Sequence, residues 1–127
     1  MGSSTPNAFL LLVTKSAFIR WSKYYSSFYD SVSAVKFNND YTKVVAALSS
    51  TSSYPSIIIV NAYDGTLISS FTESSGTSAI VYPKDGILID SSDNVYLAYK
   101  NNNNRFEITK FATTSTPTFT TTWGKEI

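Results

Sequence analysis

The sequence predicts an all-β protein built from antiparallel sheets. Its 127 residues include 9 Tyr, 8 Phe and 2 Trp, and 43% of the chain is hydrophobic. Aromatic and β-branched side chains pack well on pleated sheets. Strong helix formers are scarce, because glutamine is absent and glutamate occurs only at Glu73, Glu107 and Glu126. Short apolar stretches also alternate with turn signals along the chain, which is typical of consecutive strands.

Residues 8–25 predict a two-stranded hairpin. Residues 8–13 (AFLLLV) form a continuous apolar run, which is expected for a strand buried on both faces. Lys15 and Ser16 fit a tight turn, and residues 18–25 alternate loosely between two faces. A helix is the alternative here, but the aromatic and β-branched content favours strands.

Residues 31–71 predict the most complete unit of the chain, with strands at 32–37, 43–48, 57–62 and 66–71. The turn signals lie between these stretches. Residues 38–40 (NND) tolerate left-handed backbone geometry, and the polar loop at 49–56 contains Pro55. Asp64 and Gly65 form the dipeptide that favours a type I′ hairpin turn.

Residues 79–123 resemble the preceding unit in pattern. Residues 86–90 (GILID) correspond to AVKFN, 91–93 (SSD) stand in place of NDY, and 95–99 (VYLAY) match KVVAAL. The expected strands are 79–82, 86–90, 95–99, 106–111 and 118–123. We therefore predict one domain over residues 1–127 with a half unit (8–25) and two units (31–71 and 79–123), at a period of about 50 residues.

These units predict four-stranded antiparallel sheets in an incomplete propeller-like array, with a β-sandwich as the alternative. A closed propeller needs about four blades at minimum. An apolar strand at the end of such an array requires neighbours that this chain does not supply. The sequence therefore predicts self-association, or a place in a larger protein, through Phe9, Leu10, Leu11, Leu12 and Val13.

The composition argues against several functional classes. The net charge of +1 gives no electrostatic footprint for nucleic acid. Cysteine and histidine are both absent, which removes the thiolate and imidazole ligands and the commonest general base. The apolar run at 8–13 is too short to span a membrane. The compartment stays open: extracellular if a leader preceded this sequence, cytoplasmic otherwise.

The carboxylates are interpreted as turn residues. Asp85, Asp90 and Asp93 lie close together, but they lack the spacing of an EF-hand calcium loop. A glycosidase would need a facing pair of carboxylates. The possible members are Asp30, Asp40, Asp64, Asp85, Asp90, Asp93, Glu73 and Glu107. Nearly all of them lie in turns, so we predict no catalytic residue, no metal site and no cofactor, and the chain is not predicted to be an enzyme.

A dense aromatic cluster offers a candidate binding surface. Trp21, Tyr24, Tyr25 and Tyr29, with Phe28 among them, could stack on a carbohydrate or on another protein. The alternative, which we favour, is that these rings form a hydrophobic closing layer between sheets.

The repeat resembles the β-propeller repeats of the PQQ-like (quinoprotein-like) class, in the degenerate form found in ciliates and other protists. The resemblance covers residues 8–124. It rests on SAVKFNNDYTKVVAAL, IIIVNAYDGTLISSF and GILIDSSDNVYLAY, and on the strand-ending Trp21 and Trp123. Catalytic members of that class bind a quinone and calcium, but no such positions are identified in this chain. The resemblance implies a propeller architecture and a binding or scaffold role.

The leading hypothesis is a non-enzymatic structural or protein–protein interaction module that forms a homo-oligomer, a filament or part of a larger propeller. A carbohydrate-binding module and a non-catalytic fragment of a quinoprotein-like enzyme are the alternatives.

Overall fold

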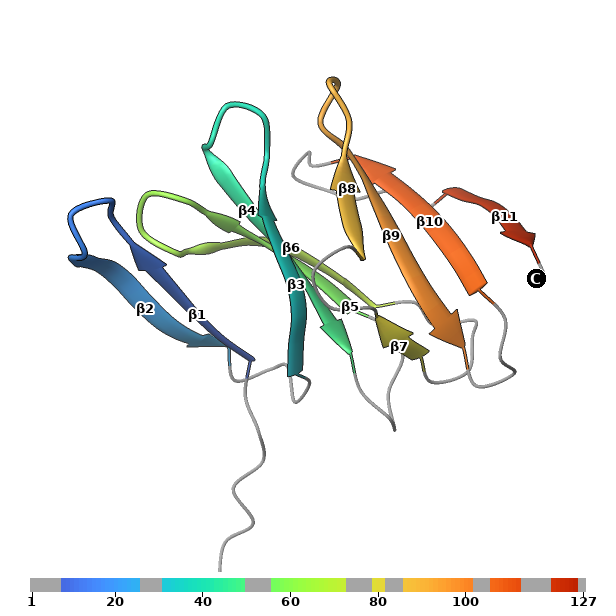
Figure 1. Ribbon diagram of the computed structural model, residues 1–127, viewed down its shortest axis with the longest axis horizontal. Coiled ribbons are helices and arrows are strands. Elements are labelled where there is room, and N and C mark those ends of the chain that lie inside the picture. Colours follow the sequence, from blue (N-terminus) through green and yellow to red (C-terminus); the bar gives the residue numbers. More distant parts are fainter. Residues whose placement is uncertain are drawn as a thin grey trace, which may run out of the picture.

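A computed structural model describes residues 8–25, 31–49, 56–72, 79–81, 86–101, 106–112 and 120–125. All regular structure in these residues is β-strand, and every ladder is antiparallel (Figure 1). The strands are β1 (Ala8–Val13), β2 (Ile19–Tyr25), β3 (Ser31–Phe37), β4 (Lys43–Ser49), β5 (Ser56–Asn61), β6 (Leu67–Thr72), β7 (Ala79–Val81), β8 (Ile87–Ile89), β9 (Asn94–Asn101), β10 (Phe106–Ala112) and β11 (Thr120–Lys125). The predicted all-β fold class is confirmed.

The strands form three sheets in chain order. β1 and β2 make a hairpin, β3-β4-β5-β6 make a middle sheet, and β7 to β11 make a third sheet. In the third sheet β7 and β8 both pair with β9, β7 opposite residues 99–101 and β8 opposite residues 95–97. These two short strands therefore share one edge of β9. The described strands close neither a barrel nor a propeller.

The middle sheet is buried on both faces, which explains its continuous apolar strands. Along β5, Ile58 and Val60 face the hairpin, whereas Ile57 and Ile59 face the third sheet. β4 alternates in the same way, and all of these β5 side chains are at most 1% exposed. Successive residues of a strand point to opposite faces, so apolar residues at every position place one layer on each side. The three sheets therefore stack with the middle sheet between the other two (Figure 1).

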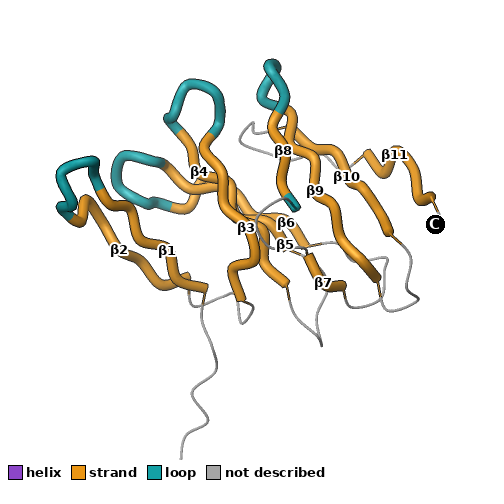
Figure 2. Tube along the Cα trace, viewed as in Figure 1, coloured by secondary structure: helices purple, strands orange, loops and turns teal. Residues whose placement is uncertain are grey.

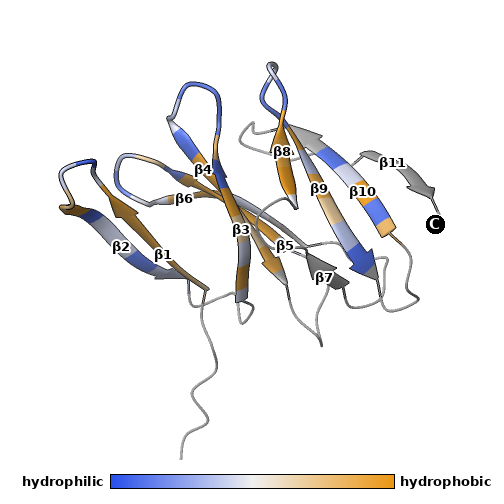
Figure 3. Ribbon diagram, viewed as in Figure 1, coloured by the Kyte–Doolittle hydropathy of each residue, from blue (hydrophilic) through white to orange (hydrophobic). Residues whose placement is uncertain are grey.

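β1 differs from this pattern although its sequence is equally apolar along its length (Figure 3). Ala8 and Leu10 are buried against the middle sheet, whereas Phe9, Leu11 and Val13 are 42%, 46% and 48% exposed. The prediction that residues 8–13 are buried on both faces is wrong for the chain alone. The hairpin is at the end of the stack, so the described chain covers only one of its faces.

Three of the hairpin turns share one geometry. In each, a residue accepts a hydrogen bond from the amide three positions later, and that later residue has a left-handed backbone. The pairs are Thr14 with Ala17, Asn38 with Tyr41, and Asp90 with Asp93, with φ of 64°, 61° and 61° at the second residue. Figure 2 shows these turns at the same end of the stacked sheets.

The turn between β5 and β6 differs from the predicted type I′ turn. A type I′ turn requires positive φ at both central residues, but Gly65 has φ of +73° and Asp64 is not in the left-handed region. The amide of Gly65 donates to the Asn61 carbonyl at 2.8 Å, and the amide of Asn61 donates to the Thr66 carbonyl at 2.8 Å. The loop is therefore longer than a two-residue hairpin, and the type I′ prediction is wrong.

Hydrogen bonds connect the first turn of the middle sheet to the first turn of the third sheet. The Asn39 amide donates to Asp93 Oδ1 at 2.9 Å, and Asn39 Nδ2 donates to the Asp90 carbonyl at 2.6 Å. Asn38 Nδ2 lies 3.3 Å from Asp93 Oδ2. These contacts hold the turn ends of the two sheets together, in addition to the apolar contacts between their faces.

Candidate functional site

The predicted self-association strand presents only alternate residues to the surface. Leu10 is buried and Leu12 is partly buried against the middle sheet, so neither belongs to the face of β1 that points away from that sheet. Phe9, Leu11 and Val13 point the other way and remain exposed. The accessible part of the predicted surface is thus every second residue of β1.

β2 extends this exposed surface. The ladder places Phe9 opposite Tyr24 and Val13 opposite Ile19. Tyr24 and Ile19 are 72% and 66% exposed, and the rings of Phe9 and Tyr24 lie 4.7 Å apart. We call Phe9, Leu11, Val13, Ile19 and Tyr24 the outer apolar face. Contiguous apolar patches on a sheet are characteristic of interaction surfaces.

Two of the four aromatic candidates lie inside the protein. Trp21 and Tyr25 are 9% and 7% exposed and pack against the middle sheet. The indole Nε1 of Trp21 donates to the Ala62 carbonyl at 3.0 Å, and the Tyr25 hydroxyl donates to the Gly65 carbonyl at 2.7 Å. These side chains anchor the hairpin to the β5–β6 turn and do not form an exposed binding surface.

Burial alters the acidity of Tyr25. Desolvation of the phenol, with a smaller contribution from the negative charge of Asp64, raises the pKa of Tyr25 to about 12. The hydroxyl therefore keeps its proton, and its hydrogen bond to Gly65, well into the alkaline range.

The other two aromatic candidates are not part of this interface. Tyr24 is exposed on the outer apolar face, and Tyr29 lies outside the described residues.

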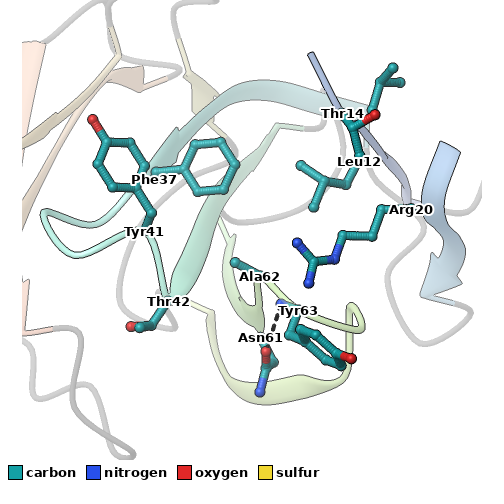
Figure 4. A pocket seen from close by; sticks show the side chains of 10 residues that line it. Leu12, Thr14, Arg20, Phe37, Tyr41, Thr42, Asn61, Ala62 and Tyr63 are labelled. Atoms are coloured by element: carbon teal, nitrogen blue, oxygen red, sulfur yellow. Dashed lines mark hydrogen bonds between the residues drawn. The ribbon is translucent and has the colours of Figure 1, made fainter. Parts of the chain in front are cut away.

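A cleft lies between the hairpin and the turn end of the middle sheet (Figure 4). Its volume is about 640 Å³, in the range of small-molecule sites. The hairpin contributes Leu12, Val13, Thr14 and Arg20, and the middle sheet contributes Phe37, Tyr41, Thr42, Asn61, Ala62 and Tyr63. No carboxylate lines the cleft, and Arg20 is the one charged residue of its lining.

A β-bulge places Arg20 in this cleft. Leu12 pairs with Trp21 and Val13 pairs with Ile19, which leaves Arg20 without a cross-strand partner. A bulge inserts one extra residue and re-aims the side chains around it. The Arg20 guanidinium lies 4.5 Å from the centre of the Tyr63 ring. The contact is a cation–π interaction, worth about 0.5–1 kcal/mol at an exposed site.

The turn carboxylates are engaged in their own turns. The Asp40 carboxylate accepts from Thr42, and the Asp64 carboxylate accepts from Thr66, and these hydrogen bonds lower the pKa of both acids. Asp90 accepts from Asn94 above all, and its pKa falls to about 2. Across the described residues no three acidic side chains gather where a metal ion could bind.

The cleft was not predicted from the sequence. Its residues come from four separate segments, at 12–14, 20, 37–42 and 61–63, and none of them belongs to a recognisable motif. One signal was present, an arginine between Ile19 and Trp21 in a strand rich in aromatic residues. No local pattern indicated that a bulge would direct this exposed side chain toward the cleft.

No protein-family model, curated protein or solved structure matches this chain. The described part of the chain also contains no helix that is long and apolar enough to cross a membrane.

Proposed function

We propose that this chain is a non-enzymatic interaction module that associates with another sheet of the same kind through the outer apolar face. The larger object is a homo-oligomer, a filament or an extended propeller-like stack. The observation that carries the proposal is the exposure of five apolar side chains on one face of the end hairpin, at 42–72%. Covering such a face releases about 25 cal/mol per Å² of apolar area.

The stack itself supports this proposal. Within the chain, two interfaces already form by the packing of one apolar sheet face on the next. A third interface of the same kind would extend the stack beyond β1 and β2. The shared geometry of the turns that follow β1, β3 and β8 supports a repeated unit, and arrays of repeated units bury their core between neighbours.

Leu11→Lys tests the proposal, because it places a charge at the centre of the outer apolar face. The matched control is Leu67→Lys on β6, since Leu11 and Leu67 are 46% and 47% exposed. We expect analytical ultracentrifugation of the unmodified chain to show species above its 14.0 kDa mass. The protein concentration should range from about 1 to 100 µM, so that a micromolar Kd would be detected. Such a Kd corresponds to a binding free energy of about −8 kcal/mol. The Leu11→Lys variant should be monomeric over this range, whereas the Leu67→Lys variant should associate like the unmodified chain.

Two results would overturn the proposal. One is a folded monomer of the unmodified chain at every concentration. The other is equal loss of association in both variants, which would place the contact surface elsewhere.

A further inference from the structure

The two interfaces of the stack differ at their turn ends. Between the middle and third sheets, Asn39 and Asp93 bridge the turns directly. At the turn end between the hairpin and the middle sheet lies the cleft that contains Arg20. We propose that this cleft binds a short oligosaccharide that carries a carboxylate, such as a chain of uronic acids. This site borders the outer apolar face, and the two share only Val13.

The charge of the cleft favours an anion. Arg20 forms no ion pair with any carboxylate of the described residues, and its guanidinium lies against the Tyr63 ring. The guanidinium carbon lies 4.5 Å from the ring centre, and none of its N–H groups donates a hydrogen bond to a described residue. A guanidinium offers five donors in a planar fork that matches a carboxylate with two parallel hydrogen bonds. A carboxylate in the cleft would therefore meet a cation without displacing an existing partner.

The polar side chains of the cleft favour a ligand rich in acceptors. Asn61 Oδ1 already accepts from the Tyr63 amide at 2.8 Å, so its Nδ2 group remains to donate. Thr14 Oγ1 accepts from the Phe18 amide at 3.2 Å, so its hydroxyl proton also remains. Carboxylate, ring and hydroxyl oxygens of an acidic sugar suit these donors.

The aromatic rings favour a sugar over a small inorganic anion. Phe37 and Tyr41 lie on one side of the cleft, with ring centres 5.7 Å apart, and Tyr63 lies on another side below Arg20 (Figure 4). Ring faces present an apolar surface, and the C–H groups on one face of a pyranose are also apolar. A cleft with apolar walls and a few convergent polar groups is the usual form of a small-molecule site.

The test is a calorimetric titration of the full chain with trigalacturonic acid, together with its fully methyl-esterified form, which has the same rings and no charge. We expect saturable binding of the acid and little or none of the ester. Arg20→Gln should lower the affinity for the acid by at least about tenfold, which is the size expected for loss of charge-assisted hydrogen bonds. Arg20→Lys should recover part of the affinity, because it keeps the charge and loses the fork.

Lys36→Gln is the matched control. It removes one positive charge from β3 at an exposed position outside the cleft lining, so it should leave affinity within about twofold, since surface charges at a distance are screened by salt. Near-UV circular dichroism would show that each variant retains its packed aromatic environment.

Four outcomes would overturn the proposal. The first is no binding of the acid at about 10 mM, a concentration above any Kd expected of a specific site. The second is equal affinity for the acid and the ester, and the third is equal affinity of Arg20→Gln and the unmodified chain for the acid. The fourth is tighter binding of a blocked Asp-Gly-Asp peptide than of the sugar acid. The last result would assign the cleft to an acidic peptide.

Discussion

At the residue scale, the indole N–H of Trp21 and the hydroxyl of Tyr25 fix the position of the hairpin. Trp21 and Tyr25 place their rings in the interface and direct one donor each to a carbonyl of the β5–β6 turn. A buried carbonyl that loses its partner costs about 1–3 kcal/mol. The two hydrogen bonds therefore specify which part of the middle sheet the hairpin covers, whereas the apolar contacts supply most of the attraction.

Tyr25→Phe tests this role by removing the hydroxyl and keeping the ring. We expect the free energy of unfolding to fall by about 1–2 kcal/mol, because the Gly65 carbonyl loses its donor. Urea unfolding measures the change. Tyr24→Phe is the matched control on the same strand, and it should change stability by less than about 0.5 kcal/mol because Tyr24 is 72% exposed. Equal effects of the two substitutions would contradict the assigned role.

The raised pKa of Tyr25 also predicts a pH dependence. Between the ordinary tyrosine pKa of 10.0 and about 12, the unfolded chain releases the phenol proton whereas the folded chain keeps it. Folding stability from this group is therefore complete below pH 10 and decreases as the pH rises to about 12. Tyr25→Phe should reduce the alkaline loss of stability, and an unchanged alkaline profile would contradict the raised pKa.

The sequence predicted some individual residues better than others. The aspartates were assigned to turns because Asp caps its own backbone, and Asp40, Asp64 and Asp90 do so. The roles of Arg20 and Tyr63 were not predicted. Their contact joins segments 43 residues apart in the chain, and no local pattern specifies such a meeting.

At the scale of elements, the hairpin and the β5–β6 turn fit closely at Gly65. This glycine has φ of +73°, and a Cβ atom built there would lie 2.7 Å from Cε3 of Trp21. Glycine is thus required twice, for the left-handed backbone and for the space that the indole occupies. The hairpin and the β5–β6 turn can approach each other this closely because residue 65 has no side chain.

Gly65→Ala should therefore destabilise the protein by at least about 2 kcal/mol, from left-handed strain and steric overlap together. Urea unfolding measures the loss, and near-UV circular dichroism should show a changed Trp21 environment. Ala17→Gly is the control, because Ala17 has a similar φ of 64° but is exposed. It should change stability by less than about 1 kcal/mol. A Gly65→Ala variant as stable as the unmodified chain would contradict the close contact.

Most elements could be predicted from the sequence, because apolar alternation and turn residues are local signals. Each predicted strand has a counterpart, and the alignment of residues 91–93 with 39–41 places Asp93 opposite Tyr41, which share the left-handed geometry. The exposure of β1 was predicted incorrectly. A continuous apolar run is equally suited to two covered faces or to one covered and one exposed face, and sequence pattern alone does not distinguish them.

At the scale of the whole molecule, the middle sheet holds the stack together from both sides. Ile58 and Ile59 are adjacent in β5 and fully buried, yet they belong to different interfaces, Ile58 with the hairpin and Ile59 with the third sheet. The two clusters share no residue. Stability of the whole therefore depends on two cores that meet only through the backbone of one sheet.

Ile58→Ala and Ile59→Ala should each lower the free energy of unfolding by about 2–5 kcal/mol, as is usual for buried isoleucine. Denaturant unfolding of both variants measures this. Ile108→Ala is the control, because Ile108 is 45% exposed on the third sheet, and it should cost distinctly less. A neutral effect at either buried position would show that the corresponding pair of sheets is not packed.

The order in which the sheets stack could be predicted only in outline. The pseudo-repeats indicated units of similar kind, and the stretches at 43–48 and 57–62 were predicted as strands without any assignment of what covers their faces. Which unit covers which face depends on contacts such as Trp21 with Ala62 and Asn39 with Asp93. Those contacts are specified by three-dimensional proximity and not by spacing along the chain.

The bulge in β2 has a consequence for how this protein can change over evolutionary time. Leu12 pairs with Trp21 and Val13 with Ile19, so loss of the single codon for Arg20 would leave a regular ladder with the same partners. Trp21 would still point inward and Ile19 outward. One in-frame deletion could therefore remove the cation from the cleft while the hairpin keeps its pairing, and one insertion could restore it.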